Sequence, residues 1–331
     1  MRVDDRARLG TSSVEVTRLG FGAAPLGNLY EELTEENARA TVERSWELGV
    51  RHFDVAPLYG CGIAEQRLGA VLPAKPRDEL VLATKVGRLL SADAAPDPMI
   101  DGLFTERPPL NPYFDFSRDG VLRSLEESLE RLGLDRVDVV HIHDPYDHCD
   151  AALAHAYPAL AELRAQGVIG AVGVGIADSA ILARFARETD VDCFLLPGRY
   201  SLLVHDELTE LLPLCAERDV SLIIGGVYNG GILAKPTDDA RFEYRQAPPE
   251  TIARARRLEA VCARHDVPLA AAAIQYPLGS PVVAGIIVGA VTAAEMEENA
   301  RLFELPIPAD LWAELRAEGL LSADVPVPGG A

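Results

Sequence analysis

The sequence predicts one closed (β/α)8 barrel, and three observations support this fold class. Short β-branched runs alternate with longer amphipathic stretches, as in a sheet whose strands run parallel. About eight such runs occur, and each is followed by a helical pattern. No Ser/Gly-rich linker or shift in composition divides the chain, so we expect residues 1–331 to form a single domain.

The strand candidates are nearly all apolar, as expected for parallel strands that helices cover on both faces. A doubly wound open sheet would show a similar pattern, and the count of eight favours the barrel. The candidates are Val14–Gly20, Arg51–Ala56, Leu80–Val86, Asp138–Asp144, Ala171–Ile176, Cys193–Arg199, Ser221–Val227 and Gly285–Ala290.

Helix boundaries are recognisable between these strands. Thr34 is placed to cap a helix that ends near Gly49. Asp119 is placed to open a second helix, which ends at Gly133.

Two further segments are expected to extend the barrel. Residues 8–16 predict a small hairpin that turns at Gly10 to Ser13 and plugs the bottom of the barrel. Residues 87–118 carry five prolines and are too long for an ordinary strand-to-helix loop. Because they leave the rim where barrel active sites assemble, we expect a lid over the substrate, with an ordered surface excursion as the alternative.

Composition limits the partners and the compartment. With 31 basic and 51 acidic residues the net charge is −20, which repels nucleic-acid phosphates and anionic membrane surfaces. No apolar run is long enough for a membrane helix, and the charged N-terminus is unlike a signal peptide. The five cysteines form no C-x-x-C pair, which is typical of reduced thiols. The sequence predicts a cytoplasmic protein with a small-molecule partner and leaves its oligomeric state open.

Four polar side chains fall at consecutive strand ends or just beyond them. Asp54, Lys85 and His143 end the second, third and fourth strands, and Tyr59 lies on the loop after the second. This combination suits carbonyl reduction or its reverse, because hydride transfer must be matched by a proton moving to or from the substrate oxygen. We expect Tyr59 to carry that proton. A structural salt bridge beside a rim tyrosine is the alternative.

The other three side chains have expected roles beside Tyr59. Lys85 would be the cation that lowers the pKa of the Tyr59 phenol. Asp54 would pair with Lys85 and position it. His143 would form a hydrogen bond to the substrate oxygen where negative charge develops.

The surrounding motifs carry a specific resemblance. The stretch Phe53-Asp-Val-Ala-Pro-Leu-Tyr-Gly-Cys-Gly-Ile-Ala-Glu-Gln-Arg-Leu-Gly, with Thr84-Lys-Val-Gly and Ile142-His-Asp-Pro, resembles the aldo-keto reductase superfamily. The resemblance runs from about residue 8 to about residue 315. It implies a catalytic tetrad of Asp54, Tyr59, Lys85 and His143, and NAD(P) as the cofactor.

Three further stretches are similar to the aldose and pyridoxal dehydrogenase branch of that superfamily. They are Phe114-Asp-Phe-Ser-Arg-Asp-Gly-Val-Leu-Arg-Ser, Gly198-Arg-Tyr-Ser-Leu-Leu and Gly225-Gly-Val-Tyr-Asn-Gly-Gly-Ile-Leu-Ala. The implied reaction is oxidation of a sugar's anomeric hydroxyl to a lactone, or the reverse carbonyl reduction. A pyridoxal-type alcohol–aldehyde conversion is the nearest alternative.

Several positions depart from the wider superfamily and shape the expected cofactor site. Gly175-Ile176 stands where most members have Ser-Asn, so Tyr228 and Asn229 are expected to help hold the cofactor instead. Glu295 and Gly289 stand near positions that carry cations in members preferring NADP. A carboxylate at Glu295 would repel a 2′-phosphate, so we expect NAD as the preferred cofactor, with NADP possible.

The resemblance thus implies two sets of binding residues. The cofactor set is Gly22, Ala23, Asp54, Gly175, Gly225, Val227, Tyr228, Asn229, Gly230, Gly289, Ala290, Val291, Glu295, Glu298 and Asn299. The substrate set is Tyr30, Leu58, Tyr59, Arg88 and His143. For Arg88, pairing with an acidic substituent and pairing with a neighbouring carboxylate are both open.

Two other classes of protein compete with this interpretation. A metal-dependent hydrolase would use His141-x-His143, with Asp144 and His148 close by, although later strand ends supply no further histidine. A non-catalytic barrel could bind a nicotinamide cofactor as a sensor, since a fold does not guarantee activity.

Overall fold

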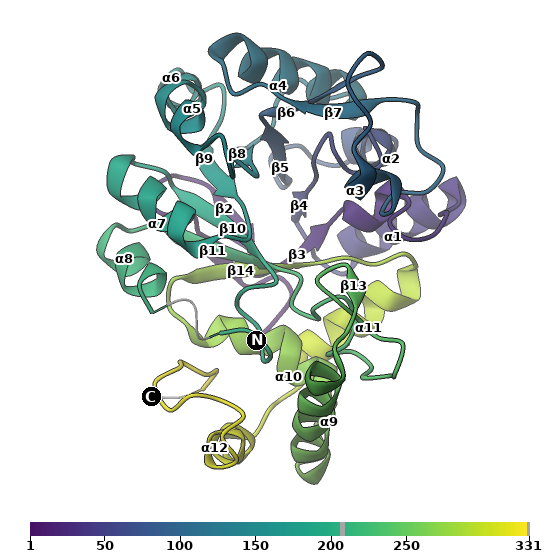
Figure 1. The fold of residues 1–331 in the computed structure, drawn as a ribbon, viewed down its shortest axis with the longest axis vertical. Helices are drawn as coiled ribbons and strands as arrows, with labels where there is room; N and C mark the ends of the chain where they lie inside the picture. Colours follow the sequence, from purple (N-terminus) through teal and green to yellow (C-terminus); the bar gives the residue numbers. More distant parts are fainter. Residues whose placement is uncertain (206–208, 330–331) are drawn as a thin grey trace.

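Eight parallel strands form a closed barrel at the centre of the protein (Figure 1), in the order β10-β11-β14-β3-β4-β5-β8-β9. The computed structural model describes residues 1–205 and 209–329. The barrel strands are β3 (Leu19–Gly22), β4 (His52–Asp54), β5 (Val81–Val86), β8 (Val139–His143), β9 (Ala171–Gly175), β10 (Cys193–Pro197), β11 (Ser221–Gly225) and β14 (Val283–Val288). The predicted (β/α)8 fold class is confirmed.

One predicted strand is wrong in its extent. The run Val14–Gly20 divides into β2 (Glu15–Thr17) and the start of β3 at Leu19. The first part pairs antiparallel with β1 (Arg6–Arg8), because this buries Val16 beneath the barrel rather than within its wall.

The hairpin of β1 and β2 closes one end of the barrel, as predicted. Its buried residues Leu9 and Val16 pack with the lowest inward-facing side chains of the strands, among them Val139 and Cys193. The opposite end, where the strands finish, is therefore the open one.

Helices surround the barrel and cover the outer faces of its strands (Figure 1). The longer ones are α1 (Glu35–Glu47), α2 (Ile63–Gly69), α4 (Arg118–Leu132), α6 (Tyr157–Ala165), α7 (Ser179–Glu188), α8 (Leu211–Glu217), α9 (Pro249–Arg264), α10 (Leu269–Gln275), α11 (Ala293–Glu304) and α12 (Ala309–Ala317). Short turns of helix are η1 (Ala24–Gly27), η2 (Leu72–Ala74), α3 (Pro98–Asp101), α5 (Cys149–Ala151), η3 (Ala152–Ala156) and η5 (Tyr276–Gly279).

The predicted helix caps are correct at one helix and shifted at the other. Thr34 caps α1 by accepting a hydrogen bond from the Asn37 amide. At α4 the capping residue is Ser117, which accepts from the Gly120 amide, and Asp119 lies inside the first turn. Gly133 ends α4 in a left-handed conformation, as expected for a glycine after a helix.

Alternation along each strand decides which side chains reach the barrel interior. Val140 and Ile142 of β8 pack outward with the helices, so His141 and His143 point inward. The same alternation directs Asp54 of β4 and Lys85 of β5 into the barrel near its open end.

The long segment after β5 has secondary structure of its own. β6 (Arg88–Ser91) pairs antiparallel with β7 (Asn111–Phe114), and α3 lies between them. An isolated bridge joins Phe104 to Leu29 in the loop after β3. The segment is thus tied to a neighbouring rim loop, and its role as a lid stays a prediction.

A second hairpin rises from the connection after β11, where the sequence indicated none. It consists of β12 (Arg241–Phe242) and β13 (Arg245–Gln246). Glu243 and Tyr244 at its tip both have positive φ, as in a tight two-residue turn.

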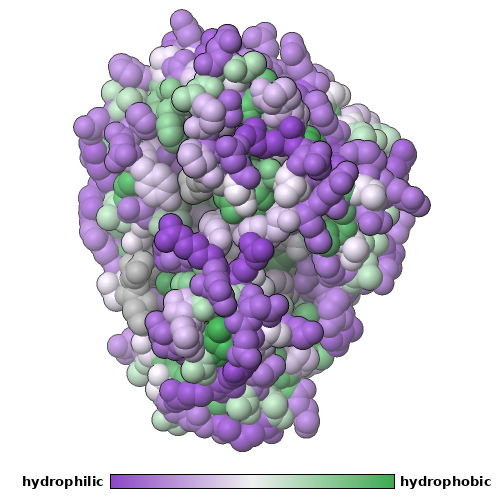
Figure 2. Space-filling model, turned by 45° about the vertical axis from the view of Figure 1, so that its right-hand side comes forward, coloured by the Kyte–Doolittle hydropathy of each residue, from purple (hydrophilic) through white to green (hydrophobic). Residues whose placement is uncertain are grey.

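Polar residues dominate the exterior on the face that Figure 2 shows. Among the described residues, no helix is both long and apolar enough to cross a membrane.

Candidate active site

A buried ion pair lies at the open end of the barrel. Lys85 Nζ donates to Asp54 Oδ1 at 2.5 Å and to the carbonyl oxygen of Val55 at 2.9 Å. The Lys85 and Asp54 side chains are each 2% exposed. Adjacent strands β4 and β5 hold the two residues, and two bonds fix the ammonium in place.

Tyr59 and His143 complete the predicted group. The Lys85 ammonium lies 4.9 Å from the centre of the Tyr59 ring. The rings of Tyr59 and His143 are 6.2 Å apart, centre to centre, and almost perpendicular. The structure therefore brings together all four side chains that the strand-end pattern selected.

The pKa of Tyr59 is not lowered in this structure, contrary to the expectation from Lys85. Burial raises the pKa of Tyr59 well above its usual value, and the charges of Asp54 and Asp144 raise it further. The Asp54 carboxylate, 2.5 Å from the Lys85 ammonium, offsets part of the Lys85 charge. Tyr59 is therefore a protonated phenol in the free protein at neutral pH.

His143 is a neutral imidazole. Burial, followed by the nearby cations Arg88 and Lys85, lowers its pKa well below the usual value. Its Nδ1 atom is buried without a hydrogen-bond partner among the described residues, and Nε2 lies 3.6 Å from Asp144 Oδ2. A neutral imidazole can donate one hydrogen bond to an oxygen in the open end of the barrel.

Close backbone packing fixes the loop that carries Tyr59. Gly60 has φ of +62°, and a Cβ on it would lie 2.4 Å from the carbonyl oxygen of Gly27. A Cβ on Gly27 would in turn lie 2.5 Å from the amide nitrogen of Gly60. Only glycine fits at either position, so the loop after β4 and the turn after β3 are locked together.

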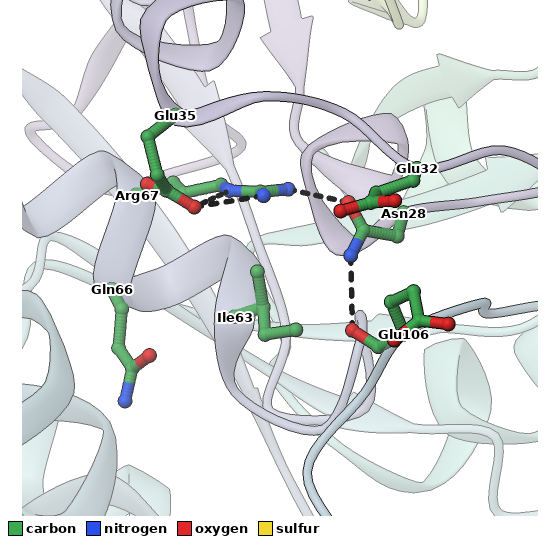
Figure 3. A pocket seen from close by; sticks show the side chains of 7 residues that line it. All are labelled: Asn28, Glu32, Glu35, Ile63, Gln66, Arg67 and Glu106. Atoms are coloured by element: carbon green, nitrogen blue, oxygen red, sulfur yellow. Dashed lines mark hydrogen bonds and ion pairs between the residues drawn. The ribbon is translucent and has the colours of Figure 1, made fainter.

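A buried arginine holds the loop after β3 from the other side (Figure 3). Arg67 of α2 donates to the carbonyl oxygens of Leu26 and Leu33, each at 2.6 Å, and to Asn28 Oδ1 at 2.7 Å. It also pairs with Glu35 at 2.8 Å. Arg67 thereby anchors the segment that leads from Gly27 to the expected substrate residue Tyr30.

The other expected substrate residues have clear positions. Tyr30 has φ of +70°, and the Arg241 guanidinium lies 4.3 Å from its ring centre. Leu58 is buried in an apolar cluster with Ile100 and Phe104, so its side chain supports the loop that carries Tyr59.

Arg88 pairs with neighbouring carboxylates. Its Nη1 donates to Asp144 Oδ2 at 2.9 Å, and Nη2 lies 3.7 Å from Asp97. The guanidinium is 6% exposed and lies 5.1 Å from the centre of the Phe114 ring. This favours the neighbouring-carboxylate alternative over recognition of an acidic substituent.

Glycines line the opposite side of the open end. Gly22, Gly175 and Gly225 face inward from β3, β9 and β11, where a Cβ would meet neighbouring atoms no closer than 3.5 Å. At Gly175 one of those neighbours is Cε of Lys85. Each of the three glycines therefore leaves room for at least a methyl group on the inner face of the barrel.

The segment after β14 and the start of α11 have partners of their own. Thr292 caps α11, and the Glu295 carboxylate accepts from the Val291 amide at 2.8 Å. Glu298 forms two bonds of 2.7 Å with Arg301, a cation one turn further along. Glu295 thus has a structural function at the helix start, which the pattern Thr-x-x-Glu could have indicated.

The loop after β11 lies against the same helix. The Tyr228 hydroxyl donates to Asn299 Oδ1 at 2.9 Å, so two residues of the expected cofactor set touch. Asn229 donates to the carbonyl oxygen of Gly198 at 3.1 Å, while its Oδ1 is buried without a described partner. This buried oxygen can accept a hydrogen bond from a bound amide.

The rest of the expected cofactor set lies in backbone positions around this region. The Ala23 amide donates to the Asp54 carbonyl oxygen, and Gly289 packs against Pro25. Gly230 has φ of +74° beside β12. Val227 and Ala290 are buried.

The metal-hydrolase alternative lacks a ligand set. No group of three or more His, Cys, Asp or Glu side chains in the described ranges is arranged to hold a metal ion. His141 is fully buried in the barrel interior, and burial lowers its pKa well below the usual value. It is a neutral core histidine.

Four residues near the site were not among the site residues expected from the sequence. Asp144 had been considered only as a metal ligand; Phe104, 6.4 Å from Tyr59 ring to ring, belonged to the predicted lid. Tyr244 and Arg241 lie on the unpredicted hairpin, and ionisation of Tyr244 would raise the pKa values of both Tyr59 and Tyr30. No turn motif in the sequence indicated that hairpin.

The sequence model of the Aldo/keto reductase family matches residues 18–318, which span the barrel. Fold and match together define an oxidoreductase built on a (β/α)8 barrel. The chain is 45% identical to D-threo-aldose 1-dehydrogenase of a Pseudomonas species, covering 94% of this chain and 96% of the relative. It is 39% identical to pyridoxal 4-dehydrogenase of Microbacterium luteolum, covering 97% and 99%. The chain belongs to the aldo-keto reductase family, and its cofactor is a nicotinamide dinucleotide.

Solved structures agree with the fold. The holo form of the aldo-keto reductase AKR11C1 from Bacillus halodurans superimposes with a TM-score of 0.77 at 26% identity, covering 97% of each chain. The glycerol dehydrogenase AKR11B4 from Gluconobacter oxydans gives 0.78 at 20% identity, covering 99% of this chain and 98% of that one, which supports the fold alone.

Proposed function

We propose that this protein oxidises the anomeric hydroxyl of an aldose to a lactone, with NAD as the preferred cofactor and Asp54, Tyr59, Lys85 and His143 as the catalytic group. The observation that carries the proposal is the arrangement of Tyr59 and His143, whose rings stand 6.2 Å apart over the buried Lys85–Asp54 pair. The 45% identity to D-threo-aldose 1-dehydrogenase supports the choice of an aldose.

The reacting oxygen of the substrate would lie between the Tyr59 hydroxyl and the His143 imidazole. His143, held neutral by burial, donates a hydrogen bond to that oxygen. The ionised form of Tyr59 takes the proton of the hydroxyl group during oxidation, and the protonated form returns it during reduction. Gly22, Gly175 and Gly225 would face a bound nicotinamide ring, which would supply the acceptor for the hydride on the carbon atom that bears the reacting oxygen.

Lys85 and Asp54 act beneath the tyrosine. The ammonium is held at 4.9 Å from the Tyr59 ring by its bonds to Asp54 and to the Val55 carbonyl oxygen. As proton transfer gives the phenol oxygen negative charge, this fixed cation stabilises it without reorganisation. Burial favours the neutral phenol of Tyr59 in the free protein. The positioned ammonium of Lys85 therefore stabilises the ionised form during the reaction.

The preference for NAD rests on the acidic start of α11. Glu295 and Glu298 place two carboxylates in its first two turns, where a 2′-phosphate would be repelled. Arg301 is engaged with Glu298 through two bonds of 2.7 Å, which reduces its availability as a phosphate partner.

A spectrophotometric screen tests the proposal. Purified protein is assayed with NAD and with NADP against a panel of aldoses, cyclic alcohols and pyridoxal, and the product is analysed for the lactone. We expect NAD reduction with at least one aldose and a lactone as product. Absence of turnover with every aldose would contradict the proposed substrate class.

Pyridoxal-type substrates are the second candidate. The 39% identity to pyridoxal 4-dehydrogenase, over 97% of this chain, supports them. In the same screen, turnover of pyridoxal without turnover of any aldose would favour this candidate.

We further propose that the protein works in the cytoplasm. The five cysteines are free thiols, and all of them are buried. Thiols in this state are typical of a reducing compartment.

A further inference from the structure

Asp144 occupies a distinctive place at the open end of the barrel. It follows His143 directly, and its φ of +48° turns the chain sharply where β8 ends. Its amide donates to the carbonyl oxygen of Gly175 at 2.9 Å, which fixes this turn to the neighbouring strand. The turn brings Asp144 Oδ2 to 3.6 Å from Nε2 of His143.

Only one oxygen of the Asp144 carboxylate accepts a side-chain hydrogen bond from the described residues. Its Oδ2 accepts from Arg88 at 2.9 Å, and Arg88 is itself almost fully buried. Its other oxygen, Oδ1, accepts no hydrogen bond from a described residue, and the side chain is 23% exposed. The Arg88 guanidinium fixes one oxygen of this carboxylate, and the other oxygen can accept a hydrogen bond from a hydroxyl group.

The Asp144 charge acts on three tyrosines near the open end of the barrel. It raises the pKa of Tyr59, of Tyr146 in the same loop as Asp144, and of Tyr244 on the β12–β13 hairpin.

The distances connect this carboxylate to the reaction. Oxygens on adjacent carbons of a sugar ring lie about as far apart as the partners of a hydrogen bond, ~3 Å. A reacting oxygen bound to Nε2 of His143 therefore places the neighbouring hydroxyl near the Asp144 carboxylate, whose Oδ2 atom lies 3.6 Å from that nitrogen.

We infer that Asp144 accepts a hydrogen bond from the hydroxyl group on the carbon next to the reacting carbon, and that it selects aldoses with a free 2-hydroxyl. This inference rests on the proposed function. Arg88 is the positioning residue that holds the carboxylate in place. Substrates with no neighbouring hydroxyl forgo this bond.

Asp97 offers a matched control. Its carboxylate also lies near Arg88, at 3.7 Å, but on the segment after β5 and not beside His143. If Asp144 merely balanced the Arg88 charge, removing either negative charge would affect all substrates alike.

The test compares an aldose with its 2-deoxy counterpart, under NAD, in the wild type, Asp144→Asn and Asp97→Asn. We expect the wild type to lose roughly 10- to 100-fold in kcat/KM when the 2-hydroxyl is absent, the worth of a hydrogen bond to a charged group. In Asp144→Asn the two sugars should differ by only a few-fold, because the aldose alone is impaired. Asp97→Asn should keep the wild-type ratio.

Each result decides the inference. An unchanged 2-deoxy ratio in Asp144→Asn overturns the role of Asp144 and leaves the proposed function standing. Equal kcat/KM values for the aldose and its 2-deoxy counterpart in the wild type would also overturn it. That comparison needs no variant that might fail to fold. Failure of the wild type to oxidise any aldose overturns the proposed function and this inference together.

Discussion

Lys85 donates a hydrogen bond of 2.5 Å to Asp54 inside the barrel, with both side chains 2% exposed. Neither charge has access to bulk water, so each depends on the other for compensation. The pair therefore contributes to two properties, the stability of the barrel and the charge beneath Tyr59. These properties can be separated by substitution.

Removing one member of the pair should destabilise the protein more than removing both. Lys85→Met leaves a buried carboxylate without its partner, and we expect a loss of about 3–5 kcal/mol in the free energy of unfolding. The double variant Lys85→Met/Asp54→Leu should regain part of this loss while remaining inactive. Chemical denaturation measures both. A double variant no more stable than Lys85→Met would contradict mutual compensation.

The pH dependence should follow the raised pKa of Tyr59. Oxidation needs the ionised phenolate of Tyr59 to accept the substrate's proton, so kcat/KM for oxidation should rise with pH and show no plateau below about pH 10, the ordinary phenol value. Reduction needs the protonated phenol and should show the opposite trend. Because burial lowers the pKa of His143, its imidazole should still be neutral at pH 6.5, where a free imidazole is half protonated. A plateau in the oxidation rate near neutrality would contradict a raised Tyr59 pKa.

Arg67 should affect catalysis without touching the substrate. It holds the segment from Leu26 to Glu35 by four contacts, and that segment is locked to the Tyr59 loop through Gly27 and Gly60. We expect Arg67→Gln to lower kcat by about tenfold, since small misplacements of reacting groups are costly. Arg67→Lys should recover only part of the loss, because lysine cannot span these acceptors.

The control for Arg67 is an exposed arginine in an ordinary ion pair. Arg39 pairs with Glu43 on the surface of α1, and Arg39→Gln should leave kcat unchanged. If Arg67→Gln retains the wild-type kcat as Arg39→Gln does, the loop after β3 keeps its position without Arg67, contrary to this prediction.

Glu295 should influence the choice of cofactor. Glu295→Arg replaces a carboxylate at the start of α11 with a cation, so kcat/KM with NADP relative to NAD should rise by about tenfold or more. Because the carboxylate also accepts from the Val291 amide, we expect a loss of about 1 kcal/mol in stability from the damaged cap. Glu295→Gln separates the two effects, since it keeps the hydrogen bond and removes the charge. A wild type that prefers NADP would contradict the assignment.

The sequence predicted the barrel because its parallel strands are continuous apolar runs, and it predicted the candidate site because polar residues end three of them. Asp54, Lys85 and His143 stand out for that reason. The division of Val14–Gly20 was not readable, since Val14 and Val16 suit either a hairpin or a barrel strand.

Other features depend on contacts between distant segments. The raised pKa of Tyr59 arises from burial, from Asp54 and also from Asp144, which is 85 positions away in the chain. The hairpin that carries Tyr244 turns at Glu243, without the Asn-Gly or Asp-Gly pair that usually indicates such a turn. The cap at Glu295 was predictable from Thr292 three residues before it.

The central claim is that Tyr59 transfers the proton, and kcat/KM for Tyr59→Phe tests it most directly. Phenylalanine keeps the ring over Lys85 and removes only the hydroxyl, so we expect a loss of about 100- to 10,000-fold with a folded protein. Tyr157→Phe, on the outer helix α6, is the matched control and should retain wild-type activity. Tyr59→Phe with activity within a few-fold of the wild type would contradict the account.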